Sequence, residues 1–281
     1  MALTGTGVWS GELRFGDVAE AAALAAELES IGYTAAWIPD LGGDLFGPFS
    51  NLLAATSTLT IASGIMNVWH HPPAEVGEWW AGLPADQRSR VMLGVGISHG
   101  PLIGEQYGRP LATMAEYLDG LDAVGIPQEQ RCIAALGPKM LELARTRTGG
   151  SHPYLVTPEH TAVARDALGH GALVAPEQGV VLETDPVTAR AIARNHLAGY
   201  LSLPNYSNNW KRFGITDEDL ADGGSDRLVD QLVAWGDDAE IAARVQQHRD
   251  AGADHVCVQV LTGDQIGMPL DQWRQLAPAL T

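Results

Sequence analysis

The chain of 281 residues is poor in cysteine and in basic residues, and it has no long apolar run. Its two cysteines, Cys132 and Cys257, both fall in strand-like apolar runs, which predicts buried thiols rather than a disulfide framework. No segment is long and apolar enough to span a membrane, and the first ten residues lack the pattern of a signal peptide. These absences predict a cytoplasmic protein with no membrane partner.

The shortage of basic residues bears on the kind of ligand. There are 17 lysines and arginines against 34 aspartates and glutamates, which gives a net charge of −17. Nucleic acids bind to basic surfaces, so we expect no nucleic-acid partner and infer a small-molecule substrate instead. An anionic cofactor would have to be held locally, by backbone N–H groups and helix dipoles, against the field of the whole chain.

What the sequence does contain is an alternation of apolar strands and amphipathic helices along nearly its whole length. Eight strands are predicted, near residues 6–10, 33–38, 59–66, 90–97, 132–136, 153–156, 172–174 or 179–182, and 255–260. Each is followed by a helix, which predicts an α/β fold with a single (β/α)8 barrel over residues 1–281. Residues 202–235 are too long for an ordinary connection, so we expect a helical insertion before strand eight that lies near the barrel mouth.

The segment 131–160 holds two successive strand-to-helix turns. Gly137 and Pro138 open one predicted helix, and Thr157-Pro158-Glu159 carries the cap, the proline and the acid of a second helix start. Such turns let backbone N–H groups approach a phosphate. The same turns also occur in α/β proteins that bind no ligand, so their spacing alone leaves both interpretations open.

Polar residues stand at several predicted strand ends, where a barrel collects its chemistry. Asp40 precedes a glycine-rich loop, Ser63-Gly64 interrupts a strand, and His99 ends the fourth strand. A carboxylate and a histidine at these places are suited to proton transfer, although a turn aspartate and a structural histidine are equally ordinary interpretations. The neighbours His70 and His71 have no carboxylate or cysteine at ligand spacing, so we expect no metal site.

With these residues in place, the whole chain resembles the luciferase-like superfamily of oxidoreductases, and within it an actinobacterial branch predicted to use the deazaflavin coenzyme F420. The resemblance rests on WIPD, IASGIMNVWHHPPAEV, LGVGISH, AALGPKMLELA and GGSHPYLVTPEHT, at residues 37–40, 61–76, 93–99, 134–144 and 149–161.

The resemblance implies a cofactor site and two catalytic residues. The deazaflavin ring would lie against a bulge with a non-prolyl cis peptide, at Ser63–Gly64 or Gly64–Ile65. Asp40 matches the aspartate that contacts the ring, and His99 matches the position of the proton donor. The residues implied to bind the cofactor are Asp40, Ser63, Gly64, Ile65, Asn67, Ser98, Ala134, Ala135, Leu136, Gly137, Pro138, Gly150 and His152.

Two departures from the sugar-phosphate dehydrogenase of this family concern the substrate. That enzyme has a histidine after the ring-contacting aspartate, where this chain has Leu41, and its general acid is a carboxylate, where this chain has His99. We therefore expect a small apolar organic substrate, in a pocket lined by Trp9, Phe46, Met66 and Trp69.

The predicted reaction is hydride transfer between the deazaflavin C5 and this substrate. The alternatives are a monooxygenase of the same fold that uses FMN and a non-catalytic carrier of F420. The resemblance and the tryptophans Trp79 and Trp80, in a predicted helix, also indicate a homodimer.

Overall fold

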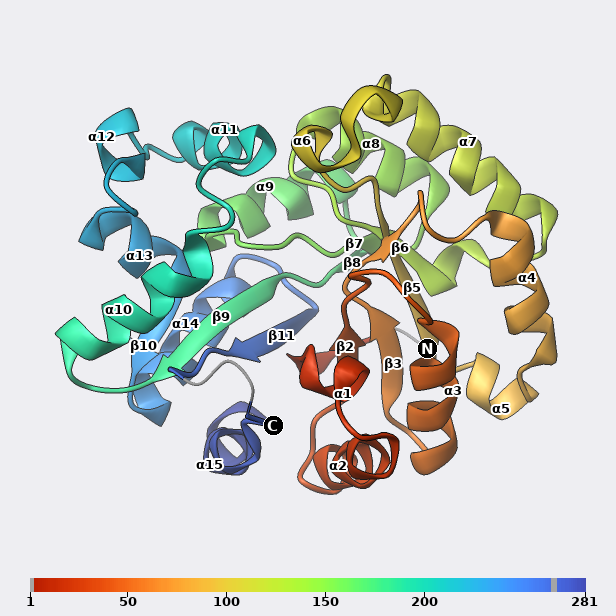
Figure 1. Cartoon of the computed structure of the whole chain (residues 1–281), viewed down its shortest axis with the longest axis horizontal. Helices are drawn as coiled ribbons and strands as arrows, with labels where there is room; N and C mark the ends of the chain where they lie inside the picture. The colour runs from red at the N-terminus through yellow and green to blue at the C-terminus, as the bar shows by residue number, and fades with distance from the viewer. Residues whose placement is uncertain (1–2, 264–266) are drawn as a thin grey trace.

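The computed structural model describes residues 3–263 and 267–281. Its centre is a parallel sheet of eleven strands, with helices around the outside (Figure 1). The strands are β1 (Gly5–Trp9), β2 (Ala35–Ile38), β3 (Thr60–Ser63), β4 (Met66–Asn67), β5 (Val91–Gly96), β6 (Arg131–Ile133), β7 (Gly150–Ser151), β8 (Leu173–Val174), β9 (Glu177–Leu182), β10 (Val233–Gly236) and β11 (His255–Val260).

The helices follow the strands in the chain. They are α1 (Glu12–Phe15), α2 (Val18–Ser30), α3 (Phe46–Ala55), α4 (Pro73–Gly82), α5 (Ala85–Arg88), α6 (Gly100–Ile103), α7 (Pro110–Ala123), α8 (Pro138–Arg147), α9 (Pro158–Leu168), α10 (Pro186–Leu197), α11 (Pro204–Arg212), α12 (Asp217–Leu220), α13 (Asp226–Leu232), α14 (Asp238–Asp250) and α15 (Leu270–Leu280). Short 3-10 turns cover Gly104–Tyr107 and Gln128–Gln130. No helix in this described part of the chain is long and apolar enough to cross a membrane.

The sheet closes on itself through one interrupted strand. Its order is β10-β9-β11-β1-β2-β3-β5-β6-β7-β8, with β4 beside β5. The path is closed because only Ala175 and Pro176 separate β8, its last strand, which pairs with β7, from β9, which pairs with β11. The N–H of Cys257 donates to the Pro176 carbonyl at 3.0 Å across the interruption. The predicted (β/α)8 barrel is thereby confirmed.

The structure differs from the prediction at strand six and contains both alternatives for strand seven. Strand six was expected at 153–156, which is wrong: the strand is Gly150–Ser151. Pro153 has no N–H to donate to a ladder, and Leu155 has a φ of 52°, which extended backbone does not adopt. Both alternatives for strand seven are present, as β8 and β9.

The segment 202–235 contains α11, α12 and α13, and its last residues enter β10. These three helices lie together on one side of the molecule, beside α9 and α10 (Figure 1). They have their own apolar cluster, which includes the buried Tyr206, Trp210 and Leu228. Pairing of β10 with β9 ties this segment to the sheet.

The barrel interior is filled by side chains from several strands. Trp37 is fully buried at its centre, stacked on His152 with ring centroids 4.0 Å apart, and its Nε1 donates to Nε2 of His255 at 3.1 Å. Cys132 and Cys257 belong to the same interior cluster, which agrees with the prediction of buried thiols. Burial raises the pKa of both thiols, so they are inert at neutral pH.

Candidate active site

A backbone bulge between β3 and β4 forms one wall of the barrel mouth. The Gly64–Ile65 peptide is cis, at the second of the two predicted bonds. Ser63 Oγ donates to the Gly94 carbonyl at 2.8 Å. A Cβ on Gly94 would lie 2.1 Å from the Ser63 carbonyl oxygen, and one on Gly96 would lie 2.4 Å from Cδ1 of Ile65. The two glycines of β5 therefore make room for the bulge.

Three of the predicted site residues meet at this bulge. Trp9 Nε1 donates to the Gly64 carbonyl at 2.9 Å. A Cβ on Gly64 would lie 2.4 Å from that same Nε1 and 3.1 Å from Nε2 of His152. Trp9 and His152 thus pack so closely on Gly64 that this position has no room for a side chain.

His152 presents an unsatisfied nitrogen at this point. Its Nδ1 donates to the Ala175 carbonyl at 2.7 Å, so Nε2 carries the lone pair of the neutral ring. Nε2 is buried and has no hydrogen-bond partner among the described residues. Burial lowers the pKa of His152 to about 4, so the ring is neutral near pH 7. A buried acceptor without a partner marks a place for a donor from a ligand.

Asp40 is placed by β2, and its carboxylate is fully buried. Oδ1 accepts the N–H of Gly42 and Oδ2 accepts the N–H of Asn67, both at 2.9 Å. His70 Nδ1 lies 3.3 Å from Oδ1 and 3.2 Å from Oδ2, and His71 Nε2 lies 3.4 Å from Oδ2. We call Asp40, Asn67, His70 and His71 the acidic side of the mouth.

Sequence reasoning considered the histidine pair only as metal ligands and missed its contact with Asp40. The partners are separated by 30 residues in the chain for His70, and no local pattern joins them. In the described part of the chain, no group of three or more histidines, cysteines, aspartates or glutamates is arranged to hold a metal ion. The one signal available was the position of His70 just after a strand interrupted by Ser63-Gly64.

His99 lies at the end of β5, where it is the N-cap residue of α6. Its Nδ1 lies 3.0 Å from Oδ1 of Asn205, and its ring centroid lies 5.3 Å from that of Tyr206. Burial lowers the pKa of His99, and the hydrogen bond to Asn205 opposes that shift. The insertion helix α11 therefore orients the histidine that the sequence singled out, whereas Ser98 before it takes a left-handed φ of 60°.

The turn predicted to cradle phosphate is partly occupied by the fold itself. The N–H groups of Ala134 and His152 donate to the Val95 and Ile133 carbonyls, both at 3.0 Å, and that of Gly150 faces Oγ1 of Thr148 at 3.3 Å. Ala135 is fully buried in the core. The N–H groups of Ala134 and His152 extend the sheet and that of Gly150 faces a side chain, so none of the three points at a ligand.

Cationic and orphaned groups gather beyond that turn, next to α9. The Leu136 carbonyl accepts from His160 Nε2 at 3.0 Å and from Arg212 Nη1 at 3.3 Å. Thr157 caps α9, and its buried Oγ1 has no partner within residues 3–263 and 267–281. Gly137 and Pro138 start α8 as predicted. An anion would find its donors here rather than in the strand ladder.

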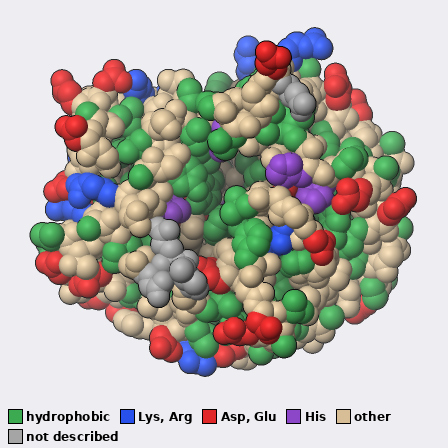
Figure 2. Space-filling view, viewed as in Figure 1, with side chains coloured by type: hydrophobic (Ala, Val, Ile, Leu, Met, Phe, Trp, Pro, Cys, Tyr) green, Lys and Arg blue, Asp and Glu red, His purple; other side chains and the backbone are tan. Residues whose placement is uncertain are grey.

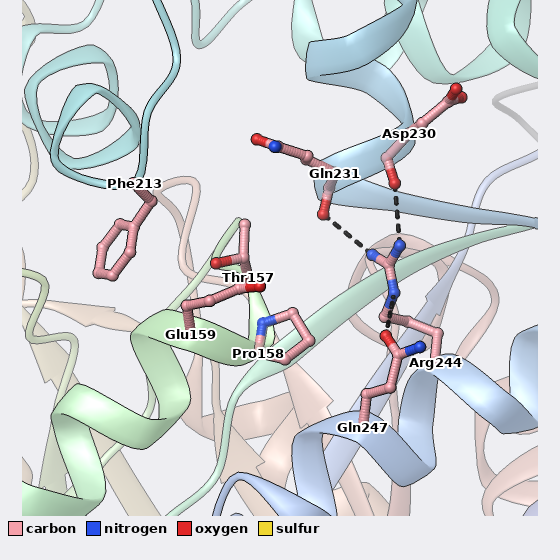
Figure 3. Close-up of a pocket in the computed structure, with 8 residues that line it drawn as sticks. All are labelled: Thr157, Pro158, Glu159, Phe213, Asp230, Gln231, Arg244 and Gln247. Carbon is pink, nitrogen blue, oxygen red and sulfur yellow. Dashed lines mark hydrogen bonds between the residues drawn. The ribbon is translucent and has the colours of Figure 1, made fainter.

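A cavity of about 480 Å³ opens beside Thr157, between α9, α13 and α14 (Figure 3). Arg244 crosses it and donates to the carbonyls of Asp230 and Gln231, both at 2.9 Å, and to Oε1 of Gln247 at 3.1 Å. The other lining residues are Pro158, Glu159 and Phe213. None of the predicted site residues lines this cavity. The Arg244 guanidinium in this cavity already donates to protein acceptors.

The four residues predicted to line a substrate pocket have different surroundings. Phe46 stacks on Trp79 at 4.8 Å and packs edge-on against His71 at 5.1 Å, and Met66 is fully buried in the main hydrophobic core. Trp69 Nε1 donates to the Ile97 carbonyl at 2.9 Å. Trp9 donates to the bulge and Met66 follows it in the chain, so a substrate pocket lined by all four residues stays a prediction.

A second network, missed by sequence reasoning, connects Tyr154 and Tyr200 with residues of β9, β11 and α10. Tyr154 donates to Oε1 of Gln259 at 2.7 Å, and its oxygen lies 3.3 Å from both His196 Nε2 and the Tyr200 hydroxyl. Glu177 Oε2 accepts the N–H of Leu155 at 3.1 Å. We call Tyr154, Glu177, His196, Tyr200 and Gln259 the tyrosine side of the mouth.

Charge is suppressed on the tyrosine side. Burial raises the pKa of Glu177 to about 8 and lowers the pKa of His196 to about 4. Oε1 of Glu177 is buried without a hydrogen-bond partner in the described part of the chain. Trp9 lies against Tyr154, with ring centroids 5.6 Å apart, and so connects this side to the bulge. Figure 2 shows a hollow in the middle of one face of the molecule, with hydrophobic side chains along it and histidine side chains beside it.

Comparison with known proteins bears on the family and on the fold. Residues 1–125 match the family model described as luciferase-like monooxygenase. No curated protein matches the sequence.

Solved structures share the fold at low sequence identity. An F420-dependent secondary alcohol dehydrogenase, in complex with an F420-acetone adduct, is 16% identical, with a TM-score of 0.74 and 99% of each chain covered. The coenzyme F420-dependent tetrahydromethanopterin reductase of Methanopyrus kandleri is 17% identical, with a TM-score of 0.76 and the same coverage.

An FMN-bound enzyme also shares this fold. The oxygenating constituent of 3,6-diketocamphane monooxygenase from Pseudomonas putida, in complex with FMN, is 16% identical, with a TM-score of 0.66 over 99% of this chain and 96% of that one. The chain is thus similar to the luciferase-like monooxygenases in the sequence of residues 1–125, and over its whole length it has the fold of these F420-dependent and FMN-bound enzymes.

Proposed function

We propose that the protein is a coenzyme F420-dependent oxidoreductase of the luciferase-like type, which transfers a hydride between the deazaflavin C5 and a small apolar organic molecule. The observation that carries the proposal is the bulge at Gly64–Ile65, framed by Trp9 and His152 at the carboxyl ends of the strands. The flat ring would lie against the backbone of this bulge, on a face other than the one that Trp9 and His152 already fill. The F420-dependent enzymes of the same fold support this choice of cofactor.

The residues present fit such a cofactor in two respects. At the bulge, the unpartnered Nε2 of His152 can accept a hydrogen bond from a polar ring edge only if Trp9 moves aside, because His152 is fully buried. Near α9, the orphaned Oγ1 of Thr157, the helix N-terminus and Arg212 together suit the phosphate of the tail. These groups can attract an anion locally, although the net charge of −17 makes the field of the whole chain repel it.

The protein's own share of the reaction is orientation and proton transfer. When bound, the deazaflavin supplies a centre that accepts or donates hydride at C5. His99 is half-buried and held by Asn205, and burial favours its neutral form, which can accept the proton that accompanies the hydride. The tyrosine side is largely buried and neutral, so its surface suits contact with an apolar substrate.

A second candidate function keeps the fold and uses FMN for monooxygenation. The family model matched by residues 1–125 and the FMN complex of the diketocamphane enzyme favour it. A deazaflavin lacks the N5 atom that supports oxygen activation, so the two cofactors imply different reactions. A third candidate, a carrier that stores F420, would not require the titratable His99.

Equilibrium titration of the purified protein with oxidised F420 and, separately, with FMN tests the proposal. We expect binding of F420 at least about tenfold tighter than FMN, a difference of about 1.4 kcal/mol. Thr157→Val should weaken binding, and the exposed Thr146→Val of α8 is the matched control. Tight binding of FMN alone would overturn the choice of cofactor.

His99→Ala separates an enzyme from a carrier. The variant should bind F420 almost as the native protein does, and it should lose most of its reduction of the cofactor by a small secondary alcohol such as propan-2-ol. If the native protein binds F420 but transfers no hydride with any alcohol or ketone supplied, the carrier becomes the better description. Homodimerisation and a cytoplasmic location are further proposals, and light scattering of the pure protein tests the first.

A further inference from the structure

The carboxylate of Asp40 has no free face. Both oxygens accept a backbone N–H at 2.9 Å, and His70 Nδ1 lies within 3.3 Å of each. The side chain is 0% exposed. A carboxylate enclosed in this way can touch a ligand only if the loops carrying Gly42 and Asn67 move away. Direct contact with the cofactor ring, which the sequence implied for Asp40, therefore lacks a path in this structure.

His70 does have such a path. Its side chain is 40% exposed, while the carboxylate behind it is completely buried. It follows β4, which pairs with β5, the strand that ends near His99. Because the strands are parallel, these loops lie at the same end of the barrel.

The orientation of the His70 ring is set from two directions. Since a carboxylate only accepts, Nδ1 carries the proton, and in the neutral ring Nε2 carries the lone pair. Asn67 Oδ1 accepts the N–H of Trp69 at 3.2 Å, which turns the amide NH2 group toward His70, and Nδ2 lies 3.3 Å from Nε2. The ring is thus clamped with Nε2 on the side away from Asp40, where its one lone pair faces the Asn67 amide. A ligand donor at Nε2 therefore replaces the Asn67 contact, which the 40% exposed side chain allows.

We propose that Asp40 acts on the barrel mouth through His70: Asp40 is a positioning residue, and Nε2 of His70 is the atom that meets the bound ring or its substrate. The proposal deepens the proposed function and rests on it for the identity of the ligand. Leu41, the residue after Asp40, is 76% exposed and has no polar role in this proposal. The polar group comes instead from the loop after β4.

Other charged groups near the pair are consistent with this arrangement. Arg14 donates to the Gly42 carbonyl at 3.0 Å and is the nearby cation, and Glu75 lies 3.4 Å from His71 Nδ1. His71 is buried and packs edge-on against Phe46, so it is not available to a ligand. Of the two histidines on the acidic side, only His70 is both oriented by Asp40 and open.

The test measures ring tautomer and cofactor affinity. In the ¹⁵N NMR spectrum of the protein without cofactor, His70 should be the Nδ1–H tautomer, and Asp40→Asn should abolish that preference. Addition of oxidised F420 should shift the Nε2 resonance of His70 and leave that of His170, an exposed histidine in the α9–β8 loop, in place.

A pair of substitutions separates ligand contact from mere support of the loop. In His70→Asn the amide NH2 group can replace Nδ1 as the donor to Asp40, but nothing replaces Nε2. We expect His70→Asn to bind F420 about fivefold more weakly, as His70→Ala does, while its urea midpoint stays near the native value. His170→Asn is the matched control and should change neither quantity.

Each outcome decides one part of the proposal. Native F420 affinity in His70→Asn would reduce His70 to a structural partner of Asp40 and overturn its contact with the ligand. An Nε2–H tautomer in the native protein would overturn the role of Asp40. If the native protein binds no F420, the ligand part is overturned together with the proposed function, whereas the tautomer measurement still decides the Asp40 part.

Discussion

The acidic side and the tyrosine side of the barrel mouth solve the problem of burying polar groups in opposite ways. On the acidic side, the Asp40 carboxylate is enclosed by two backbone N–H donors and by His70. On the tyrosine side, hydroxyl, amide and imidazole groups bond one another, and burial holds Glu177 protonated, with a pKa of about 8. One side keeps a charge by surrounding it with donors, and the other side removes charge.

The difference indicates a division of labour. A charge held behind an oriented histidine can direct a proton or a hydrogen bond, whereas a neutral aromatic wall can accept an apolar substrate. The bulge at Gly64 is connected to both, because Trp9 contacts the bulge and Tyr154, and Asn67 of the acidic side follows the bulge in β4. A ring seated on the bulge would have a polar neighbour on one side and an apolar neighbour on the other.

The largest expected effect is that of removing the carboxylate. Asp40→Ala leaves the N–H groups of Gly42 and Asn67 and the ring of His70 without their acceptor, which should cost about 3 kcal/mol in the free energy of unfolding. Urea unfolding at pH 7 measures it. Asp86→Ala, at an exposed site in α5, is the matched control and should change stability by less than about 0.5 kcal/mol. A small loss in Asp40→Ala would show that the acidic side is not organised around this carboxylate.

On the tyrosine side, burial of Glu177 should make the free energy of unfolding depend on pH. The pKa of Glu177 rises from 4.5 to about 8 on folding, so the folded chain binds the extra proton between these values. This contribution to stability is complete below pH 4.5, and it is lost as the pH rises through about 8. Glu177→Gln stays neutral, so its urea midpoint should fall less between pH 6 and pH 9, whereas the exposed Glu218→Gln should follow the native protein.

His196, also on the tyrosine side, should make stability depend on pH in the direction opposite to that of Glu177. Its pKa falls from 6.5 to about 4 on folding, so stability is complete above pH 6.5 and is lost as the pH falls through about 4. His196→Gln should therefore lose less stability than the native protein between pH 7 and pH 5. Equal acid sensitivity of the two proteins would contradict a buried neutral His196.

The smallest expected effect concerns the hydroxyl of the network itself. Tyr154→Phe removes the donor to Gln259 and should cost about 1 kcal/mol. Tyr33→Phe removes a comparable buried hydrogen bond, to the Trp273 carbonyl at 3.0 Å and away from the mouth. Both variants should lose similar stability, but only Tyr154→Phe should change the affinity for F420. Equal F420 affinity in the two would place the tyrosine side outside the site.

Local sequence patterns predicted much of the fold and some of the site. Apolar runs separated by helix starts such as Gly137-Pro138 indicated the barrel, and the interruption at Ser63-Gly64 indicated the bulge, now found with a cis bond at Gly64–Ile65. Strand six was misplaced because an apolar segment and a strand look alike in sequence, and the left-handed Leu155 leaves no signal there.

The sequence by itself determined the alternation of strands and helices along the chain, the buried cysteines and which residues follow most of the strands, because these depend on the local alternation of apolar and polar residues. Only the tertiary structure decided how those residues pair. Asp40 meets His70 across 30 positions, Tyr154 meets Gln259 across 105, and His99 meets Asn205 across 106. Such pairs depend on the register and closure of the barrel and on where the insertion docks. A hydrogen bond between distant segments leaves no periodicity in either segment.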